Sequence, residues 1–171
     1  MKNVQLAHVH HRPAPVRRPL RLLAHDMGLA SNVGTLFRIA DALGVEHLHL
    51  CGDTPVPPDP RIRRSARAAE RFVPWSHAGD ALAVVAGLRR DGWRIVCLEL
   101  STASVDIARF EVAPGDRLCL VLGAEDAGVP QALLDAADGT VHIPMLGHNS
   151  SMNVAAACAI AAYELGRRLD G

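Results

Sequence analysis

The sequence predicts an α/β fold in which helices cover both faces of a parallel sheet. Segments typical of strands alternate with segments of helical spacing along the 171 residues. Several strand segments are apolar along their whole length, and RLCLVLG at 117–123 is the clearest of them. A strand buried on both faces has such a continuous run, whereas a strand with one wet face alternates. The chain is long enough for a substantial core, so we expect one domain over residues 20–171.

The first half of the chain predicts three strands and two helices after a flexible arm. Residues 1–19 are rich in Pro and Arg and lack periodicity, which favours a flexible basic arm. Val33, Leu36, Phe37 and Ala40 have helical spacing, and Gly44 follows as a helix-ending residue. The expected elements are strand 20–26, helix 31–43, the alternating strand 45–52, a loop with four prolines at 54–60, helix 61–71 and strand 72–75.

The second half continues the alternation of helix and strand. Asp91-Gly92 ends a helical segment, and the runs WRIVCLEL and TVHIPM are typical of strands. The expected elements are helix 80–90, strand 93–100, a loop at 101–116, strand 117–123, helix 130–137, strand 140–145 and a terminal helix over 152–169.

Charge is balanced overall but unevenly distributed along the chain. Eighteen Lys and Arg match eighteen Asp and Glu. The first 21 residues hold five basic side chains and no acid, and Glu70 alone offsets a second cluster between Arg61 and Arg71. These clusters permit RNA binding. A disordered tail and a solvated helix face remain open as alternatives.

Cysteine usage and hydropathy indicate a cytoplasmic protein. The four cysteines are widely spaced without a CxxC pair, so we expect buried reduced thiols and no metal site. No apolar run approaches the roughly 20 residues of a membrane span. The N-terminal residues lack the apolar stretch of a secretory signal, so we expect no membrane partner.

Three polar segments follow predicted strands, where parallel sheets bind ligands. In the first segment, Asn32 is expected to cap a helix, and Gly34 is expected to let another backbone or a ligand come close. Arg38 is expected either to act in a site or to pair with Asp41. The chain has neither GxGxxG after its first strand nor GxxxxGK[ST], which argues against dinucleotide and P-loop chemistry.

The second and third segments lie in the C-terminal half. Gly123 is expected to let a flat ligand approach, and Glu125 to accept hydrogen bonds from loop N–H groups or Arg38. An ordinary strand-to-helix turn is the alternative for this segment. Ser151 is expected to cap the terminal helix, with Asn153 in its first turn. A hydrolase based on His148 is another reading, although no Ser-His-Asp order supports it.

The segments NVGTLFR, LVLGAEDAGVP and IPMLGHNSSMNVAAACAIAAYE resemble the three motifs of the SpoU (TrmH-type) branch of the SPOUT RNA methyltransferases. The resemblance covers about residues 20–169 in the family's order. Met152 replaces the usual Leu, and RSARAAERF lacks a Gly that the family usually carries. The resemblance implies a C-terminal deep trefoil knot, an exception to ordinary topology. It also implies bound S-adenosylmethionine and a homodimer with the site at the subunit interface.

By this resemblance, the chain is expected to methylate a ribose 2′-hydroxyl of RNA. The lack of a large appended RNA-binding domain favours tRNA over rRNA. Arg38 is expected to clamp a phosphate and the developing alkoxide, because a guanidinium stays protonated and is a poor base. A non-catalytic RNA-binding paralogue and a small-molecule methyltransferase remain alternatives.

The resemblance carries over residue by residue. The implied catalytic residues are Asn32, Arg38, Glu125, Ser151 and Asn153. The implied cofactor-binding residues are Leu122, Gly123, Ile143, Leu146 and Met152. The basic arm and the second basic cluster supply the candidate RNA-binding residues Arg17, Arg18, Arg61, Arg63, Arg64 and Arg67.

Overall fold

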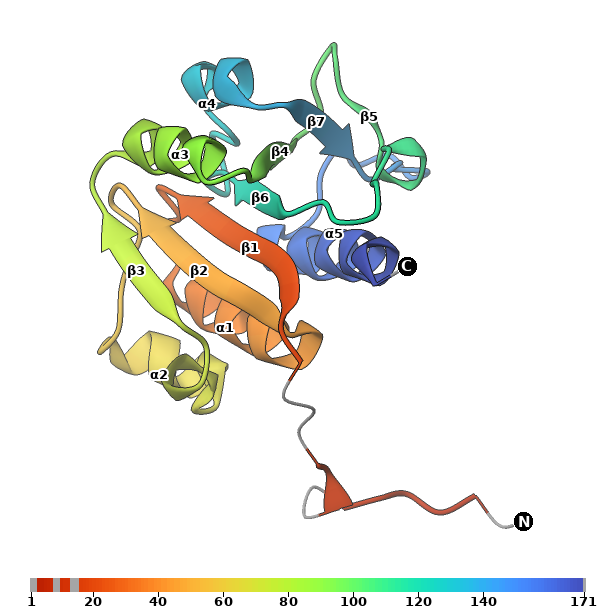
Figure 1. Ribbon diagram of the computed structural model, residues 1–171. Coiled ribbons are helices and arrows are strands. Elements are labelled where there is room, and N and C mark those ends of the chain that lie inside the picture. The colour runs from red at the N-terminus through yellow and green to blue at the C-terminus, as the bar shows by residue number, and fades with distance from the viewer. Residues whose placement is uncertain (1–2, 8–9, 13–15, 171) are drawn as a thin grey trace.

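A seven-stranded sheet forms the centre of the computed structural model, which describes residues 3–7, 10–12 and 16–170 (Figure 1). Every strand pair in it is parallel, which confirms the predicted α/β class. The spatial order is β3-β2-β1-β6-β4-β7-β5. The strands are β1 (Arg18–His25), β2 (Val45–Cys51), β3 (Trp75–Ala78), β4 (Arg94–Leu98), β5 (Val105–Asp106), β6 (Leu118–Leu122) and β7 (Gly139–His142).

Helices lie on both faces of this sheet. The helices are α1 (Ala30–Leu43), α2 (Pro60–Ala66), α3 (Ala81–Arg90), α4 (Gln131–Ala136) and α5 (Val154–Leu169). Helices α1 and α5 cover one face, with α2 beside α1, and α3 and α4 cover the other (Figure 1). Within the described ranges, no helix is long and apolar enough to cross a membrane.

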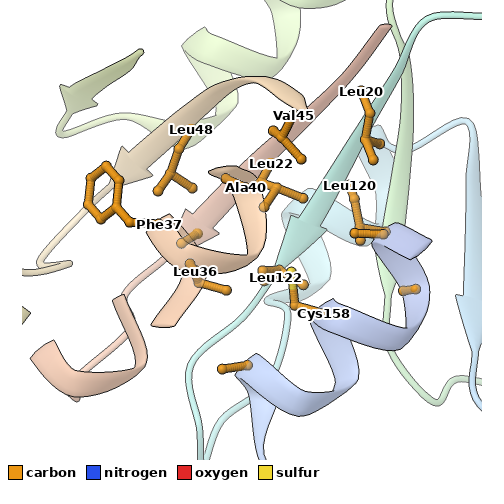
Figure 2. Packing of buried hydrophobic residues seen from close by; sticks show 14 of the residues in the cluster. Leu20, Leu22, Leu36, Phe37, Ala40, Val45, Leu48, Leu120, Leu122 and Cys158 are labelled. Carbon is orange, nitrogen blue, oxygen red and sulfur yellow. The ribbon is translucent and has the colours of Figure 1, made fainter. Parts of the chain in front are cut away.

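The core follows from the alternation of side chains along the central strands. Leu22 and Leu120 lie on the side of the sheet that faces α1 and α5, in a cluster that also includes Phe37 and Cys158 (Figure 2). Val121, the neighbour of Leu120, belongs to the second cluster, under α3 and α4. All five residues of β6 are buried, as its continuous apolar run predicts.

Several predicted boundaries are wrong, including the end of the strand predicted over 140–145, which stops at His142. The helix predicted over 61–71 ends at Ala66, because Arg67 and Ala68 have φ of 53° and 72°, and a separate 3₁₀ turn follows. The strand predicted at 72–75 forms further along the chain, as β3 at Trp75–Ala78. The loop predicted over 101–116 contains β5, which pairs with β7. The terminal helix begins at Val154 rather than residue 152.

The end of the predicted arm is fastened to the domain. Residues 1–2, 8–9 and 13–15 of the arm lie outside the described residues. Strand β1 begins at Arg18, whose guanidinium pairs with Asp170 at 2.6 Å. Arg17 donates to the carbonyl oxygens of Val45 and Phe72 at 2.9 and 2.8 Å. These guanidinium groups are already hydrogen-bonded, so RNA contacts from Arg17 or Arg18 would compete with intramolecular ones.

The four cysteines are buried and free, as predicted. Burial raises the pKa of Cys51 to about 11 and that of Cys158 to about 12. Their thiols therefore stay protonated and act as small apolar core groups.

The segment between β7 and α5 crosses the carboxyl edge of the sheet. Strand β7 lies near one side of the sheet, next to β4 and β5, whereas α5 packs against α1, β1 and β6. Residues 143–153 therefore pass close to the loops that follow β4 and β6. This crossing brings three loops together at one place.

Candidate functional site

A cleft of about 330 Å³ lies where the carboxyl ends of β6, β4 and β7 meet. Its walls come from residues 98–100, residues 122–129 and several residues between 142 and 157. The three strands are adjacent and parallel, so the loops after them share one edge. The volume lies within the range of roughly 300–1,000 Å³ typical of small-molecule sites.

The lining of the cleft combines apolar side chains with acidic ones. Leu122, Ile143 and Met152 contribute apolar surface. The acidic residues at its walls are Glu99, Glu125 and Asp126, and no Lys or Arg from the described part of the chain lines it. The cleft therefore suits a ligand with a flat apolar part and a positive charge.

Gly123 is required by the backbone of its own loop. A Cβ on Gly123 would lie 2.0 Å from the Gly128 carbonyl carbon and 2.3 Å from the Val129 nitrogen. Ala124 and Gly128 pair through N–H···O bonds of 3.2 and 3.0 Å, which close a tight turn. The space predicted to admit a ligand at Gly123 is thus taken by the Gly128 backbone, although Gly123 still lines the cleft.

Glu99 is a cleft residue that the sequence interpretation missed. Its carboxylate accepts hydrogen bonds from the N–H groups of Leu100 and Val129, both at 2.9 Å. It therefore ties the loop after β4 to the loop after β6. The available signal was a single acidic residue at the end of an apolar strand, at the edge where ligands bind.

A chain of hydrogen bonds joins the three polar segments. The Asn32 amide donates to Glu125 at 2.7 Å, and the Asn153 amide donates to the Asn32 side-chain oxygen at 3.2 Å. Asn32 is 7% exposed, so its amide groups need these partners. Three residues that are far apart in the sequence therefore form one cluster.

Glu125 also completes the start of α1. It accepts from the N–H groups of Gly28 and Leu29 at 2.9 and 3.1 Å, which lack helical partners. Partial burial raises the pKa of Glu125, but the hydrogen bonds from Asn32 and the backbone outweigh it and lower the pKa below its usual value. The predicted acceptance from loop N–H groups is confirmed, while Arg38 makes no hydrogen bond or ion pair with Glu125.

The predicted helix caps are wrong in two places. Asn153, not Ser151, caps α5, since its side-chain oxygen accepts from Ala155 and Ala156 at 3.0 and 3.2 Å. Asn32 does not cap α1, because the helix begins two residues earlier, at Ala30. Ser151 instead lines the cleft, on the same loop as Met152.

Arg38 and Leu146 lie apart from this cluster. Arg38 is exposed on α1 and makes no hydrogen bond or ion pair with any residue that the structure describes, so it does not pair with Asp41. It does not line the cleft. Leu146 is 98% exposed and also lies outside the lining, so its predicted adenine contact finds no support in this arrangement.

Gly34 allows another backbone to come close, which is one of the two alternatives predicted for it; the other was a ligand. A Cβ there would lie 2.5 Å from the Ile62 carbonyl oxygen and 2.0 Å from the Ser65 hydroxyl. This contact seats α2, which carries several arginines, against α1, which carries Arg38.

Three comparisons with known proteins agree on the family. The family model described as "SpoU rRNA Methylase family" matches residues 19–163. The tRNA (guanosine(18)-2′-O)-methyltransferase of Escherichia coli is 34% identical over 143 residues, which cover 80% of this chain and 58% of that enzyme.

Solved structures match along nearly the whole chain. An AdoMet-bound rRNA methyltransferase from Sinorhizobium meliloti matches with a TM-score of 0.83 and 27% identity, over 91% of this chain and 58% of that one. A structure titled "Structural insights into the 2-OH methylation of C/U34 on tRNA" matches with a TM-score of 0.78 and 29% identity, over 89% and 97%. This chain thus spans little more than half of the E. coli relative but nearly all of the last structure.

Gly123→Ala is expected to lower the free energy of unfolding by about 2 kcal/mol, because its Cβ meets rigid backbone. For a chain of this size, the melting temperature should fall by roughly 4–8 °C. Gly79→Ala is the matched control, since nothing lies within 4 Å of its Cβ position. Equal melting temperatures for the two variants would show that the turn tolerates a side chain.

Glu125→Gln is expected to destabilise the protein at neutral pH and to matter less in acid. The folded state lowers the pKa of this carboxyl, so its contribution is present above the ordinary value of 4.5 and disappears as pH falls through the lower folded pKa. Urea unfolding of both proteins at about pH 7 and about pH 3.5 measures the difference. A gap in stability that widens in acid would contradict this account.

Proposed function

This chain belongs to the SpoU rRNA methylase family, and we propose that it transfers a methyl group from S-adenosylmethionine to a ribose 2′-hydroxyl of RNA. The observation that carries the proposal is the Glu125–Asn32–Asn153 hydrogen-bond chain, which borders an acid-lined cleft. These residues come from three distant segments, and their convergence at the carboxyl edge of the sheet supports a shared role.

The cleft has the chemistry that S-adenosylmethionine requires. This cofactor carries a flat adenine and a cationic sulfonium, and when bound it supplies an electrophilic methyl group. Leu122, Ile143 and Met152 would pack against the apolar part, while the acidic rim suits the positive charge. Met152 is 36% exposed, so its flexible side chain is available for such packing.

The polar cluster would orient the ribose beside the cleft. Asn153 is locked as a helix cap and Asn32 is held between two partners, so both amides have fixed directions. Ser151 lines the cleft and brings a hydroxyl group to its wall. Such fixed groups lower the barrier mainly by positioning, a contribution that reaches about 7–11 kcal/mol in well-oriented reactions.

Arg38 would hold the RNA phosphate and stabilise the negative charge that develops on the ribose oxygen. Its guanidinium is exposed and has no partner among the described residues, so it is free for an incoming anion. The planar fork of donors suits both a phosphate and an alkoxide. Because arginine stays protonated, the role is electrostatic rather than that of a base.

The proposed substrate is tRNA, with rRNA as the alternative. A solved structure of which this chain covers 97% concerns methylation on tRNA, whereas another relative is named as an rRNA methyltransferase. The chain spans 58% of the matched tRNA methyltransferase from Escherichia coli and 64% of the matched rRNA methyltransferase. Its place of action would be the cytoplasm, where the substrate RNA and a reducing environment for its free thiols are found.

A homodimer and a trefoil knot complete the proposal. Helix α5 exposes Ala156, Ile160 and Tyr163 as an apolar stripe beside α1, which suits a second copy of the chain. Arg38 lies outside the cleft of its own chain, so a partner subunit would complete the site. The crossing of residues 143–153 past the loops after β4 and β6 supports the knotted path of the family.

Arg38→Ala is expected to reduce methyl transfer to tRNA by about 10²–10³-fold, because it removes a fixed donor from the developing charge. Transfer from labelled S-adenosylmethionine measures the rate, and mapping of ribose methylation identifies the nucleotide. Arg90→Ala, an exposed arginine on α3, is the matched control and should leave the rate unchanged.

Survival of transfer within about tenfold, or 1.4 kcal/mol of barrier, would remove Arg38 from this role. Calorimetry with S-adenosylmethionine tests the enzyme itself. An absence of detectable binding by the unaltered protein would instead indicate a non-catalytic RNA-binding paralogue.

Tyr163→Glu is expected to convert the dimer into a monomer, because it places a charge in the apolar stripe of α5. Sedimentation velocity should give twice the 18.3 kDa chain mass for the unaltered protein and a single chain for the variant. Leu82→Glu, on the exposed face of α3, is the control and should remain dimeric. An unaltered protein that sediments as one chain would sink the proposed dimer.

A further inference from the structure

A second cavity, of about 590 Å³, lies beside α2 and shares no lining residue with the cleft. Its walls come from the proline loop at 57–60, from α2, and from Glu70 and Arg71. The left-handed residues Arg67 and Ala68 end α2 and let the following 3₁₀ turn carry Glu70 and Arg71 to the cavity wall. Because two neighbouring non-glycine residues hold this conformation, the surrounding structure fixes the turn.

The cavity carries unpaired positive charge. Arg63, Arg64 and Arg71 line it, and none of them has a side-chain hydrogen bond or ion pair with a described residue. Asp59 also lines the cavity, but its carboxylate already binds Arg61 at 2.8 Å. The hydrogen bond from Arg61 lowers the pKa of Asp59 to about 2, so this carboxylate stays ionised and paired. Three free guanidinium forks at one cavity suit phosphate groups.

Glu70 requires something that a phosphate cannot provide. Its Oε2 atom is buried and has no hydrogen-bond partner within the described part of the chain. A buried acceptor without a donor is costly, and phosphate oxygens offer no N–H. A ligand that satisfies both Glu70 and the arginines must therefore combine an anionic group with N–H donors, as a nucleotide does.

Guanine fits this requirement best among the four bases. Its ring N–H and amino group lie side by side and match the two oxygens of one carboxylate. Adenine and cytosine offer an amino group next to a ring acceptor. The single N–H of uracil lies between two carbonyl oxygens, which repel a carboxylate.

We propose that this cavity binds a guanine nucleotide of the substrate RNA, separate from the nucleotide that is methylated. Glu70 reads the base edge, and Arg63, Arg64 and Arg71 hold the phosphates. The inference rests on the proposed function in that it takes RNA as the substrate. The close contact at Gly34 seats α2 on α1, so one RNA strand can reach both this cavity and Arg38.

Binding of short RNAs to the full chain tests the proposal. The probes are the pentanucleotides UUGUU, UUCUU, UUAUU and UUUUU, with S-adenosylmethionine present to fill the cofactor cleft. We expect UUGUU to bind at least about fivefold more tightly than UUUUU. Amide NMR shifts should move in residues 57–71.

Two variants separate base reading from phosphate binding. Glu70→Gln should bring the ratio of UUGUU to UUUUU affinity close to one while affinity for UUUUU is kept. Arg71→Ala should weaken all four probes alike and reduce the salt dependence of binding by about one charge. Arg90→Ala, on α3, is the control and should change neither quantity.

An unchanged base ratio in Glu70→Gln, or NMR shifts confined to residues outside 57–71, would overturn the proposal. Shifts at the cavity with a polyglutamate peptide but not with RNA would assign it to an acidic protein segment instead. Methyl transfer to RNA without any guanine preference in binding would contradict the guanine site and leave the proposed methyltransferase activity standing. A guanine preference without methyl transfer would support guanine binding in this cavity and contradict the proposed methyltransferase activity.

Discussion

The carboxylate of Glu125 is the interaction on which the arrangement of the site depends. It accepts from two backbone N–H groups at the start of α1 and from the Asn32 amide. Asn32 in turn accepts from Asn153, which caps α5. One ionised group therefore fixes the beginnings of two helices and the loop after β6 relative to each other. The cleft keeps its shape because its walls are joined through this carboxylate and through Glu99.

Several motif glycines serve the packing of the chain rather than a ligand. Gly34 lets α2 reach α1, and Gly123 lets the Gly128 backbone close the turn that carries Glu125. Gly128 has a φ of 68° and lies so near Glu99 that a Cβ would come within 2.3 Å of its carboxylate. Chemistry and packing are thus encoded in the same short segments. A change in one glycine would displace the acidic side chains that it neighbours.

The sequence predicts the strands better than the turns between them. Continuous apolar runs such as β6 depend only on burial, which hydropathy reports directly. The early end of α2 depends on left-handed backbone at Arg67 and Ala68, which neither residue favours and which no local pattern indicates. The segment RSARAAERF has no Gly, and Arg67 and Ala68 hold the left-handed backbone there. The cap at Asn153 could not be told from one at Ser151, since both residue types favour that position. Glu99 was missed because its partner, Val129, is 30 residues away and meets it only in the folded sheet.

The balanced net charge hides a division between two kinds of arginine. One kind donates hydrogen bonds to carbonyl oxygens and carboxylates of the same chain, as Arg17, Arg18, Arg61 and Arg94 do. Most of the unpaired guanidinium groups between residues 16 and 170 lie on α1 and in the segment around α2: Arg38, Arg63, Arg64, Arg67 and Arg71. In the rest of that range, only Arg90 and Arg109 are unpaired. A polyanion responds to free donors and not to the sum of charges, because paired arginines must first give up their partners. The electrostatic footprint for RNA is therefore set by which arginines the fold leaves unpaired, and the close contact at Gly34 is what brings those on α2 alongside Arg38.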